Sequence, residues 1–224
     1  RHINIAINKE YIEIQKYAFR KYKIKTVENK HTHLVPEELE QLERLSLTGK
    51  HMKLQKSLDA FLFCCYAGMR YSDFTNLSKK NIVDINQETW LIYKSVKTGT
   101  EVRLPLYLLF AGKGIVILNK YRNNLEDFFR LRDNSNINKD LIIIAKLAGL
   151  SKKISFHTAR HTNATLLIYN GVNITTVQKL LGHKSVKTTQ VYTNIMDMTI
   201  VHDLEKMKQA ALGIKKKTDN SFNK

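Results

Sequence analysis

The sequence predicts a mainly α-helical fold with a small antiparallel β-sheet, an α+β arrangement, and two observations support this. Apolar residues recur at helical spacing along most of the 224 residues. Between these helical segments, the runs 82–85, 90–96 and 102–106 are rich in β-branched and aromatic residues and are separated by turn residues. They are expected to form three short strands joined by tight turns.

The first 30 residues are expected to be separate from the main domain. Apolar residues keep a helical period over 3–22, until the basic run RKYKIK interrupts it, and the polar stretch 27–32 has the composition of a linker. The main domain is placed at 31–212. The lysine-rich end of the chain, 213–224, is expected to be a disordered tail.

The main domain is expected to open with helices that meet at a sharp joint. Pro36 before EELEQLERL marks a helix start, since proline suits the first turn and acidic residues there complement the helix dipole. The next helix carries an apolar stripe and stops at Gly68, which suits a C-cap. Ser72 is expected to cap a further helix that begins at Asp73. Arg70 then lies at the joint, an unusual place unless its guanidinium binds something.

Turn residues and apolar periodicity place the remaining elements. Gly99 in KTGT suits the tight turn between the second and third strands, and it puts Lys97 at the tip of that hairpin. Further helices are expected over 118–129, 139–147, 158–169, 175–181 and 200–211. SNIN, between the first two, is expected to be a loop. Asn170-Gly171 and Gly182 are expected to end the third and the fourth.

The composition points to a polyanionic partner. Lys and Arg number 37 against 20 Asp and Glu, a net charge of +17, and the resulting field favours nucleic acid first and an anionic membrane surface second. No apolar run approaches the ~18 residues of a membrane-spanning helix, and no signal sequence opens the chain. Cys64 and Cys65 are adjacent, which is poor geometry for a disulfide and for a metal site. We therefore expect a soluble intracellular protein with buried, reduced thiols.

Candidate functional side chains gather in one stretch, residues 155–193. FHTARHT places His157 and Arg160 three residues apart, so on a helix they share a face, and His161 lies one turn beyond His157. LGHKSVKTTQVYT adds His183 and, nine residues further on, Tyr192. We interpret Tyr192 as a candidate nucleophile.

Each of these residues also has a structural interpretation. Tyr192 alone is compatible with a half-buried core tyrosine, the arginines with structural ion pairs, and Lys97 with a solvated lysine at a hairpin tip. His157 and His161 imitate a zinc pair, but HTARH lacks a third ligand and the glutamate base of a metalloprotease helix. No metal or cofactor is therefore expected, and His161 is interpreted as structural.

The candidate residues follow one another in a defined order: Arg70 in GMRYSD, Lys97 on a hairpin, His157 and Arg160 in HTARH, His183 in LGH, and Tyr192. In this order and spacing they resemble the tyrosine recombinase (phage integrase) family over about 31–212. A lone H-x-x-R would be weak evidence, whereas six ordered elements are strong. The segment LGHKSVKTTQVY is most similar to integrases of bacterial mobile elements.

The resemblance implies a tyrosine recombinase-like catalytic domain that cleaves and rejoins DNA strands without a metal, for site-specific recombination. Tyr192 would attack the phosphodiester and form a 3′-phosphotyrosyl ester, which conserves the bond energy so that joining needs no ATP. Arg70 and Arg160 would bind the non-bridging oxygens. Lys97 would be the general acid for the leaving 5′-oxygen.

The resemblance also assigns roles to the other members of the set. His157 would assist proton transfer from Tyr192, and His183 would donate a hydrogen bond to the phosphate or position Tyr192. Asp73 would support Arg70 and His157 rather than react. Basic residues that are candidates for phosphate contacts are Lys152, Lys153, Lys184 and Lys187.

For organisation and partners, the resemblance implies that 1–30 are the end of a core-binding domain plus a linker. Double-stranded DNA is the expected partner, bound by a homo-oligomer that forms a tetrameric synapse. Accessory DNA-bending or excision proteins are further expected partners. The expected location is the bacterial cytoplasm, in association with the nucleoid. The helix over 200–211 either packs within its own molecule or is exchanged with a neighbouring protomer. Two alternatives remain open: type IB topoisomerase-like relaxation, and a non-catalytic DNA-binding protein on the same scaffold.

Overall fold

The computed structural model describes residues 2–17, 32–192 and 208, and the chain divides into two compact units, Arg1–Lys30 and His31–Lys224. In the first unit, α1 (His2–Asn8) is followed by a 3-10 helix, η1 (Ile14–Lys16). The single helix expected over 3–22 is therefore wrong over 9–17, and 18–22 lie outside the described residues. Glu10 has φ 59, in the left-handed region, and this conformation cannot continue a right-handed helix.

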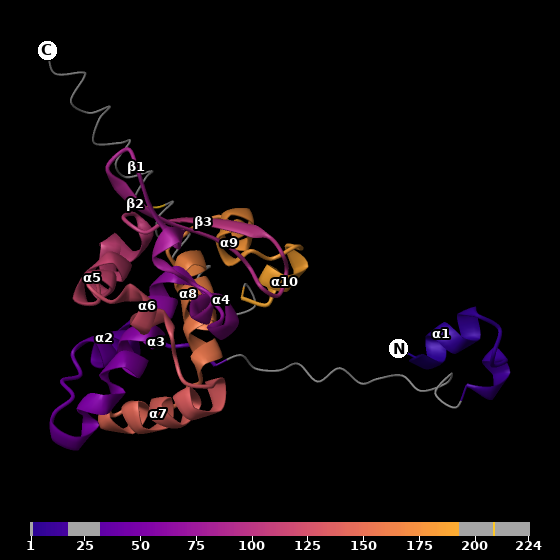
Figure 1. Cartoon of the computed structure of the whole chain (residues 1–224), viewed down its shortest axis with the longest axis horizontal. Coiled ribbons are helices and arrows are strands. Elements are labelled where there is room, and N and C mark those ends of the chain that lie inside the picture. The colour runs from indigo at the N-terminus through magenta and orange to yellow at the C-terminus, as the bar shows by residue number, and fades with distance from the viewer. Residues whose placement is uncertain (1, 18–31, 193–207, 209–224) are drawn as a thin grey trace, which may run out of the picture. The chain divides into compact units, whose positions relative to one another are not determined.

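The second unit is built around α3 (Gln55–Ala67), which lies among the other helices of the unit (Figure 1). Eleven of its thirteen residues are buried, so it is a core helix. It packs against α8 (Phe156–Tyr169), α5 (Lys113–Lys120) and α7 (Asn134–Leu147). The helix ends at Gly68, with φ 67, which confirms the predicted C-cap.

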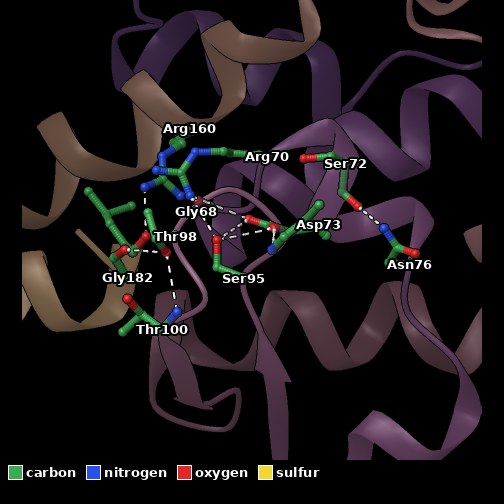
Figure 2. Close-up of polar contacts among 12 residues, drawn as sticks. Gly68, Arg70, Ser72, Asp73, Asn76, Ser95, Thr98, Thr100, Arg160 and Gly182 are labelled. Atoms are coloured by element: carbon green, nitrogen blue, oxygen red, sulfur yellow. Dashed lines mark hydrogen bonds and ion pairs between the residues drawn. The ribbon is translucent and has the colours of Figure 1, made fainter. Parts of the chain in front are cut away.

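The joint after Gly68 differs in detail from the prediction. Helix α4 (Tyr71–Thr75) begins two residues before Asp73, with Arg70 at its N-cap position. The predicted cap at Ser72 is wrong, because Ser72 lies inside the helix, where its carbonyl accepts a hydrogen bond from the side chain of Asn76 at 2.9 Å (Figure 2). Arg70 still lies at the joint between the two helices.

Aromatic packing fixes α4 on the helical core. The ring of Phe74 in α4 meets Phe128 and Phe129 of α6 (Leu125–Phe129) edge-on, at centroid distances of 5.3 and 5.5 Å. It also meets Phe63 of α3 at 5.9 Å. Because Phe74 is fully buried, this cluster holds the short helix and the residues at its start in one position.

The predicted antiparallel sheet is confirmed. Strands β1 (Ile82–Ile85), β2 (Glu88–Lys94) and β3 (Glu101–Pro105) pair in the order β1-β2-β3. Leu91 lies opposite both Ile82 and Leu104, on the face that is buried against the core. The loop between β2 and β3 is closed by Gly99, with φ 68, whose N–H donates to the carbonyl of Ser95 at 2.8 Å. The sheet thus presents this loop beside α9 (Ile174–Leu181), which packs on β3 (Figure 1).

Two other expectations about helices were wrong. The helix expected over 118–129 is two helices, α5 and α6, because Asn124 interrupts it and caps α6 by accepting from the N–H of Asp127. SNIN is not a loop but the start of α7, which Asp133 caps by accepting from the N–H of Asn136 at 3.0 Å. The other elements before α5 are α2 (Pro36–Glu43), η2 (Gly49–Leu54), η3 (Lys79–Asn81) and η4 (Leu109–Gly112).

The last described elements carry most of the candidate residues. Helix α8 begins at Phe156, where Ser155 and Thr158 form a capping box, and α9 ends at Gly182, as predicted, with φ 62. The short α10 (Lys187–Gln190) leads to Tyr192. The helix expected over 200–211 and the tail at 213–224 lie outside the described residues, apart from position 208. In the described parts of the chain no helix has the length and apolarity to cross a membrane.

Candidate active site

Arg160 is the most deeply buried of the candidate residues, with 1% of its surface exposed. Its Nη1 donates to the carbonyl oxygen of Gly68 at 2.7 Å and its Nη2 to that of Leu181 at 2.6 Å (Figure 2). These carbonyls belong to the C-terminal ends of α3 and α9, whose dipoles favour a positive charge. Burial, followed by the nearby charge of Arg70, lowers the pKa of Arg160 to about 10, so the guanidinium stays charged at neutral pH.

Arg70 lies beside Arg160 and is fixed by polar groups of the sheet loop. Its Nη1 donates to Asp73 Oδ2 at 3.4 Å and to Ser95 Oγ at 3.2 Å (Figure 2). The buried carboxylate of Asp73 also accepts from the N–H of Val96 at 2.8 Å and from the hydroxyl of Ser95 at 3.3 Å. Asp73 therefore ties Arg70 to the β2–β3 loop, and its negative charge also acts on Arg160.

The β2–β3 loop reaches the end of α9. The hydroxyl of Thr98 donates to the carbonyl oxygen of Gly182 at 3.1 Å (Figure 2). Lys97, the residue before Thr98, is exposed on this loop. Gly182 is required here, because a Cβ atom would lie 2.6 Å from Cγ2 of Val102 on β3. These two contacts of Gly182 hold the β2–β3 loop, which carries Lys97, against the segment that carries His183.

His183 is buried and neutral. Its Nδ1 lies 2.9 Å from the hydroxyl of Thr189, and 8% of the residue is exposed. Burial lowers the pKa of His183 to about 3, and the charges of Arg160, Arg70, His157 and Lys97 act in the same direction. The imidazole therefore carries no charge at neutral pH, because burial and the charges of Arg160, Arg70 and Lys97 disfavour its protonated form.

The lowered pKa of His183 predicts a dependence of stability on pH. Between the ordinary histidine value of ~6.5 and about 3, the unfolded chain binds a proton that the folded protein does not bind. The stabilisation from neutral His183 is thus present above ~6.5 and is lost as pH falls through this window, by about 1.4 kcal/mol per pH unit. We expect urea titrations from pH 7 to pH 4 to give a smaller loss of unfolding free energy for His183→Gln than for the unchanged protein.

The control for this pH series is His51→Gln. His51 lies on η2, which precedes the N-terminus of α3, whereas Gly68 and the candidate site lie at the C-terminus of that helix. This variant should leave the pH slope unchanged. An equal slope in the unchanged protein and in His183→Gln would show that His183 titrates normally.

Tyr192 contacts His161. Its hydroxyl lies 3.1 Å from His161 Nδ1, and their ring centroids are 5.5 Å apart. The His161 ring in turn meets the ring of His157 edge-on at 4.5 Å, and His157 is exposed. Burial raises the pKa of Tyr192, while the charges of Arg160 and Arg70 lower it, and the net direction is upward. The phenol therefore holds its proton at neutral pH, and it would need a base in order to act as a nucleophile.

Three residues of this site were not predicted from the sequence as site residues: His161, Ser95 and Thr189. The sequence interpretation treats His161 as structural, whereas the structure places it against the candidate nucleophile. Its position four residues after His157, on the same helix face, is the signal that points to it. Ser95 and Thr189 carry no such signal. Within the described residues, no group of three or more His, Cys, Asp or Glu side chains could hold a metal ion.

Comparison with known proteins identifies the family. The sequence model of the phage integrase family matches residues 32–198. A tyrosine recombinase of Pseudothermotoga lettingae is 30% identical over 181 residues, which are 79% of this chain and 60% of that protein. The tyrosine recombinase XerC of Rickettsia prowazekii is 29% identical over 185 residues, 78% of this chain and 58% of the relative. The chain thus spans about 60% of the length of these relatives.

Solved structures share the fold. A λ integrase tetramer bound to a Holliday junction matches with a TM-score of 0.66 and 19% identity, over 85% of this chain and 55% of that chain. The XerA recombinase matches with a TM-score of 0.59 and 21% identity, over 91% and 79%. The Tn1549 transposon integrase matches with 0.62 and 16% identity, over 85% and 70%. With its helical unit, its three-stranded sheet and the match over 32–198, the chain belongs to the phage integrase family of tyrosine recombinases.

Proposed function

We propose that this chain cleaves and rejoins DNA strands in site-specific recombination, through a 3′-phosphotyrosyl intermediate on Tyr192. The observation that carries the proposal is the pair of neighbouring arginines, Arg70 and Arg160. Among the described residues Asp73 forms an ion pair with Arg70, and no carboxylate forms one with Arg160. Two guanidinium groups held together in this way would bind a dianionic or phosphodiester group and stabilise the charge of its transition state.

The hydrogen bonds of Arg160 use only part of its hydrogen-bonding capacity. A guanidinium has five N–H donors, and Gly68 and Leu181 take two of them. Three remain for non-bridging phosphate oxygens. Because both carbonyls hold the guanidinium before any DNA is bound, binding does not have to reorganise it, and such preorganisation is a main source of electrostatic catalysis.

The proposed cleavage step transfers two protons. The Oη atom of Tyr192 forms a bond to phosphorus while the bond from phosphorus to the 5′-oxygen breaks. The phenolic proton passes to a base, for which His161 Nδ1 is the neighbour at 3.1 Å. Lys97 donates a proton to the departing 5′-oxygen, which leaves as a hydroxyl. Rejoining is the reverse, with the 5′-hydroxyl as nucleophile.

The remaining histidines would assist in different ways. His183, neutral and buried, would donate a hydrogen bond to a non-bridging oxygen. His157 is exposed and contacts His161, so it would share the proton that leaves Tyr192 and pass it toward solvent. Asp73 would act through Arg70 by fixing its guanidinium, together with Ser95.

The contact of His161 with Tyr192 predicts a measurable loss when it is removed. We expect His161→Phe to slow single-turnover DNA cleavage by about 100-fold, because the phenylalanine ring preserves the packing but cannot accept the proton of Tyr192, and a general base typically contributes about 10²- to 10⁴-fold. DNA affinity should stay unchanged, and His51→Phe on η2 is the matched control. A cleavage rate within twofold of the unchanged protein would show that His161 is only a packing residue.

We further propose that the chain integrates or excises a mobile element as a homo-oligomer on double-stranded DNA. The segment LGHKSVKTTQVY supports the first point, and the fold shared with the λ and Tn1549 integrases is consistent with it. The λ integrase structures contain dimers and a tetramer on DNA. Four points stay predictions. They are the packing of the segment over 200–211, within its own molecule or by exchange with a neighbour, the accessory DNA-bending or excision proteins, a nucleoid-associated cytoplasmic location, and a core-binding origin of 1–30.

The test is a search for a covalent adduct. The chain would be incubated with a pool of duplexes of randomised sequence, each nicked so that the cleaved piece diffuses away and rejoining fails. Adducts that resist denaturant would be isolated, their DNA sequenced and the modified peptide mapped. Adducts on Tyr192 that share one DNA sequence support the recombinase. Adducts spread over unrelated sequences would favour topoisomerase-like relaxation, and DNA binding without any adduct would favour a non-catalytic binder.

A further inference from the structure

The segment from His183 to Tyr192 contains a polar contact to which the proposed function gives no role. Thr189 has 0% of its surface exposed, and its hydroxyl lies 2.9 Å from His183 Nδ1. A buried threonine hydroxyl in a short helix needs a partner, because leaving its proton unpaired is costly. Among the described residues, Nδ1 of His183 is the partner of this hydroxyl.

The main chain on both sides of the contact is already fixed. The N–H of His183 donates to the carbonyl of Gln178 at 3.0 Å, and Gln178 Nε2 donates to the carbonyl of His183 at 3.0 Å. The N–H of Thr189 donates to the carbonyl of Val186 at 2.7 Å. What these bonds leave undetermined is the orientation of the imidazole ring and the nitrogen that carries its proton.

Counting donors and acceptors decides the tautomer. A neutral imidazole has one N–H and one bare nitrogen. If Nδ1 carried the proton, the hydroxyl of Thr189 would accept it, and its own proton would have no acceptor among the described residues. If Nδ1 is bare, the hydroxyl donates to it and both groups are satisfied. The second arrangement is favoured by about tenfold or more, since a buried unpaired donor is avoided.

We propose that Thr189 is a positioning residue that holds His183 as the tautomer with its proton on Nε2, so that Nε2 donates a hydrogen bond to the scissile phosphate. The inference rests on the proposed function for its final step. The lowered pKa of His183 is consistent with it, since the ring stays neutral and has one proton to place.

Thr189 also joins the histidine to the candidate nucleophile. Its side chain fixes His183, and its carbonyl accepts the N–H of Tyr192 at 3.1 Å. A movement of the turn that carries Tyr192 would therefore move the hydroxyl that orients the imidazole. The hydrogen-bond donor for the phosphate and the attacking oxygen are in this way positioned by one residue, from α10.

The variants that test the inference are Thr189→Val, which keeps the shape but lacks the hydroxyl, and Thr189→Ser, which restores it. Thr188→Val is the matched control, because Thr188 is the adjacent threonine and is exposed. The first measurement is the ¹⁵N chemical shifts of the His183 ring at neutral pH, in the protein without DNA. We expect the Nε2–H form in the unchanged protein, in Thr189→Ser and in Thr188→Val, and a mixture of tautomers in Thr189→Val.

The second measurement is the single-turnover cleavage rate with and without His183. Thr189→Val should cleave about tenfold more slowly, Thr189→Ser nearly normally, and Thr189→Val should cause no further loss in a His183→Ala background. An unchanged Nε2–H tautomer in Thr189→Val would overturn the inference, as would an equal loss in the His183→Ala background. If the tautomer shifts but the unchanged protein forms no adduct, the proposed function fails while the pairing of Thr189 with His183 stands.

Discussion

Replacing Tyr192 by phenylalanine is expected to abolish the covalent adduct with DNA. The change removes one oxygen, the atom proposed to attack phosphorus. The hydroxyls of Ser95 and Thr189 cannot replace it, because both are buried and hydrogen-bonded to other site residues. Loss of a catalytic nucleophile typically lowers the rate by about 10⁴ to 10⁶. Adduct formation on the nicked pool, followed on denaturing gels, should therefore fall below detection.

The remainder of the molecule should tolerate this change. The phenylalanine ring fills the same volume, and the substitution removes the hydrogen bond between Tyr192 and His161, which costs about 1 kcal/mol of unfolding free energy. DNA affinity should stay within about twofold, since the arginines and the basic surface are intact. Tyr107→Phe, in the segment after β3, is the control and should keep full activity. Adduct that persists in Tyr192→Phe would mean that another side chain is the nucleophile.

The sequence predicts best those features that a single residue decides. Gly68 and Gly182 end their helices with positive φ, and glycine adopts this conformation without strain, so both ends were predictable. The start of α7 was not, because several residues in DNSNIN make good N-caps and the sequence alone does not choose among them. Asp133 takes this role, three residues before Asn136, whose N–H donates to its carboxylate.

The candidate site shows the same division between local and distant contacts. The residue types and their order along the chain indicate the family, so Arg70, Arg160 and Tyr192 could be named in advance. The carbonyl oxygens that hold Arg160 belong to residues 92 and 21 positions away, and no local pattern records such contacts. The same is true of His161, which meets a tyrosine 31 residues further along the chain.

Replacing Arg160 by lysine is expected to leave DNA binding in place and to slow cleavage at least ~100-fold, the size of effect seen when a preorganised donor is removed. A lysine keeps the charge but has one nitrogen and three donors, whereas the guanidinium offers five in a planar fork. Two of the three would be needed for the carbonyl oxygens of Gly68 and Leu181. One donor would then remain for the phosphate, where arginine offers three.

The same substitution should also destabilise the protein. Arg160 is buried, and a single lysine nitrogen reaches the carbonyl oxygens of Gly68 and Leu181 with poorer geometry than two guanidinium nitrogens do, which costs about 1 to 3 kcal/mol of unfolding free energy. Urea titration should detect this decrease. Arg103→Lys, an exposed arginine on β3 that pairs with Glu101, is the control and should change neither stability nor cleavage beyond error.

The two effects of Arg160→Lys can be separated by their size. A domain of ordinary stability unfolds with about 5 to 15 kcal/mol, so a decrease of about 3 kcal/mol still leaves more than ~95% of the molecules folded. Unfolding can then reduce the measured cleavage rate by only a few per cent. A decrease of about 100-fold in the cleavage rate at saturating DNA must therefore come from the chemical step. Near-normal cleavage by a destabilised variant would show that Arg160 stabilises the fold but does not bind the phosphate in the transition state.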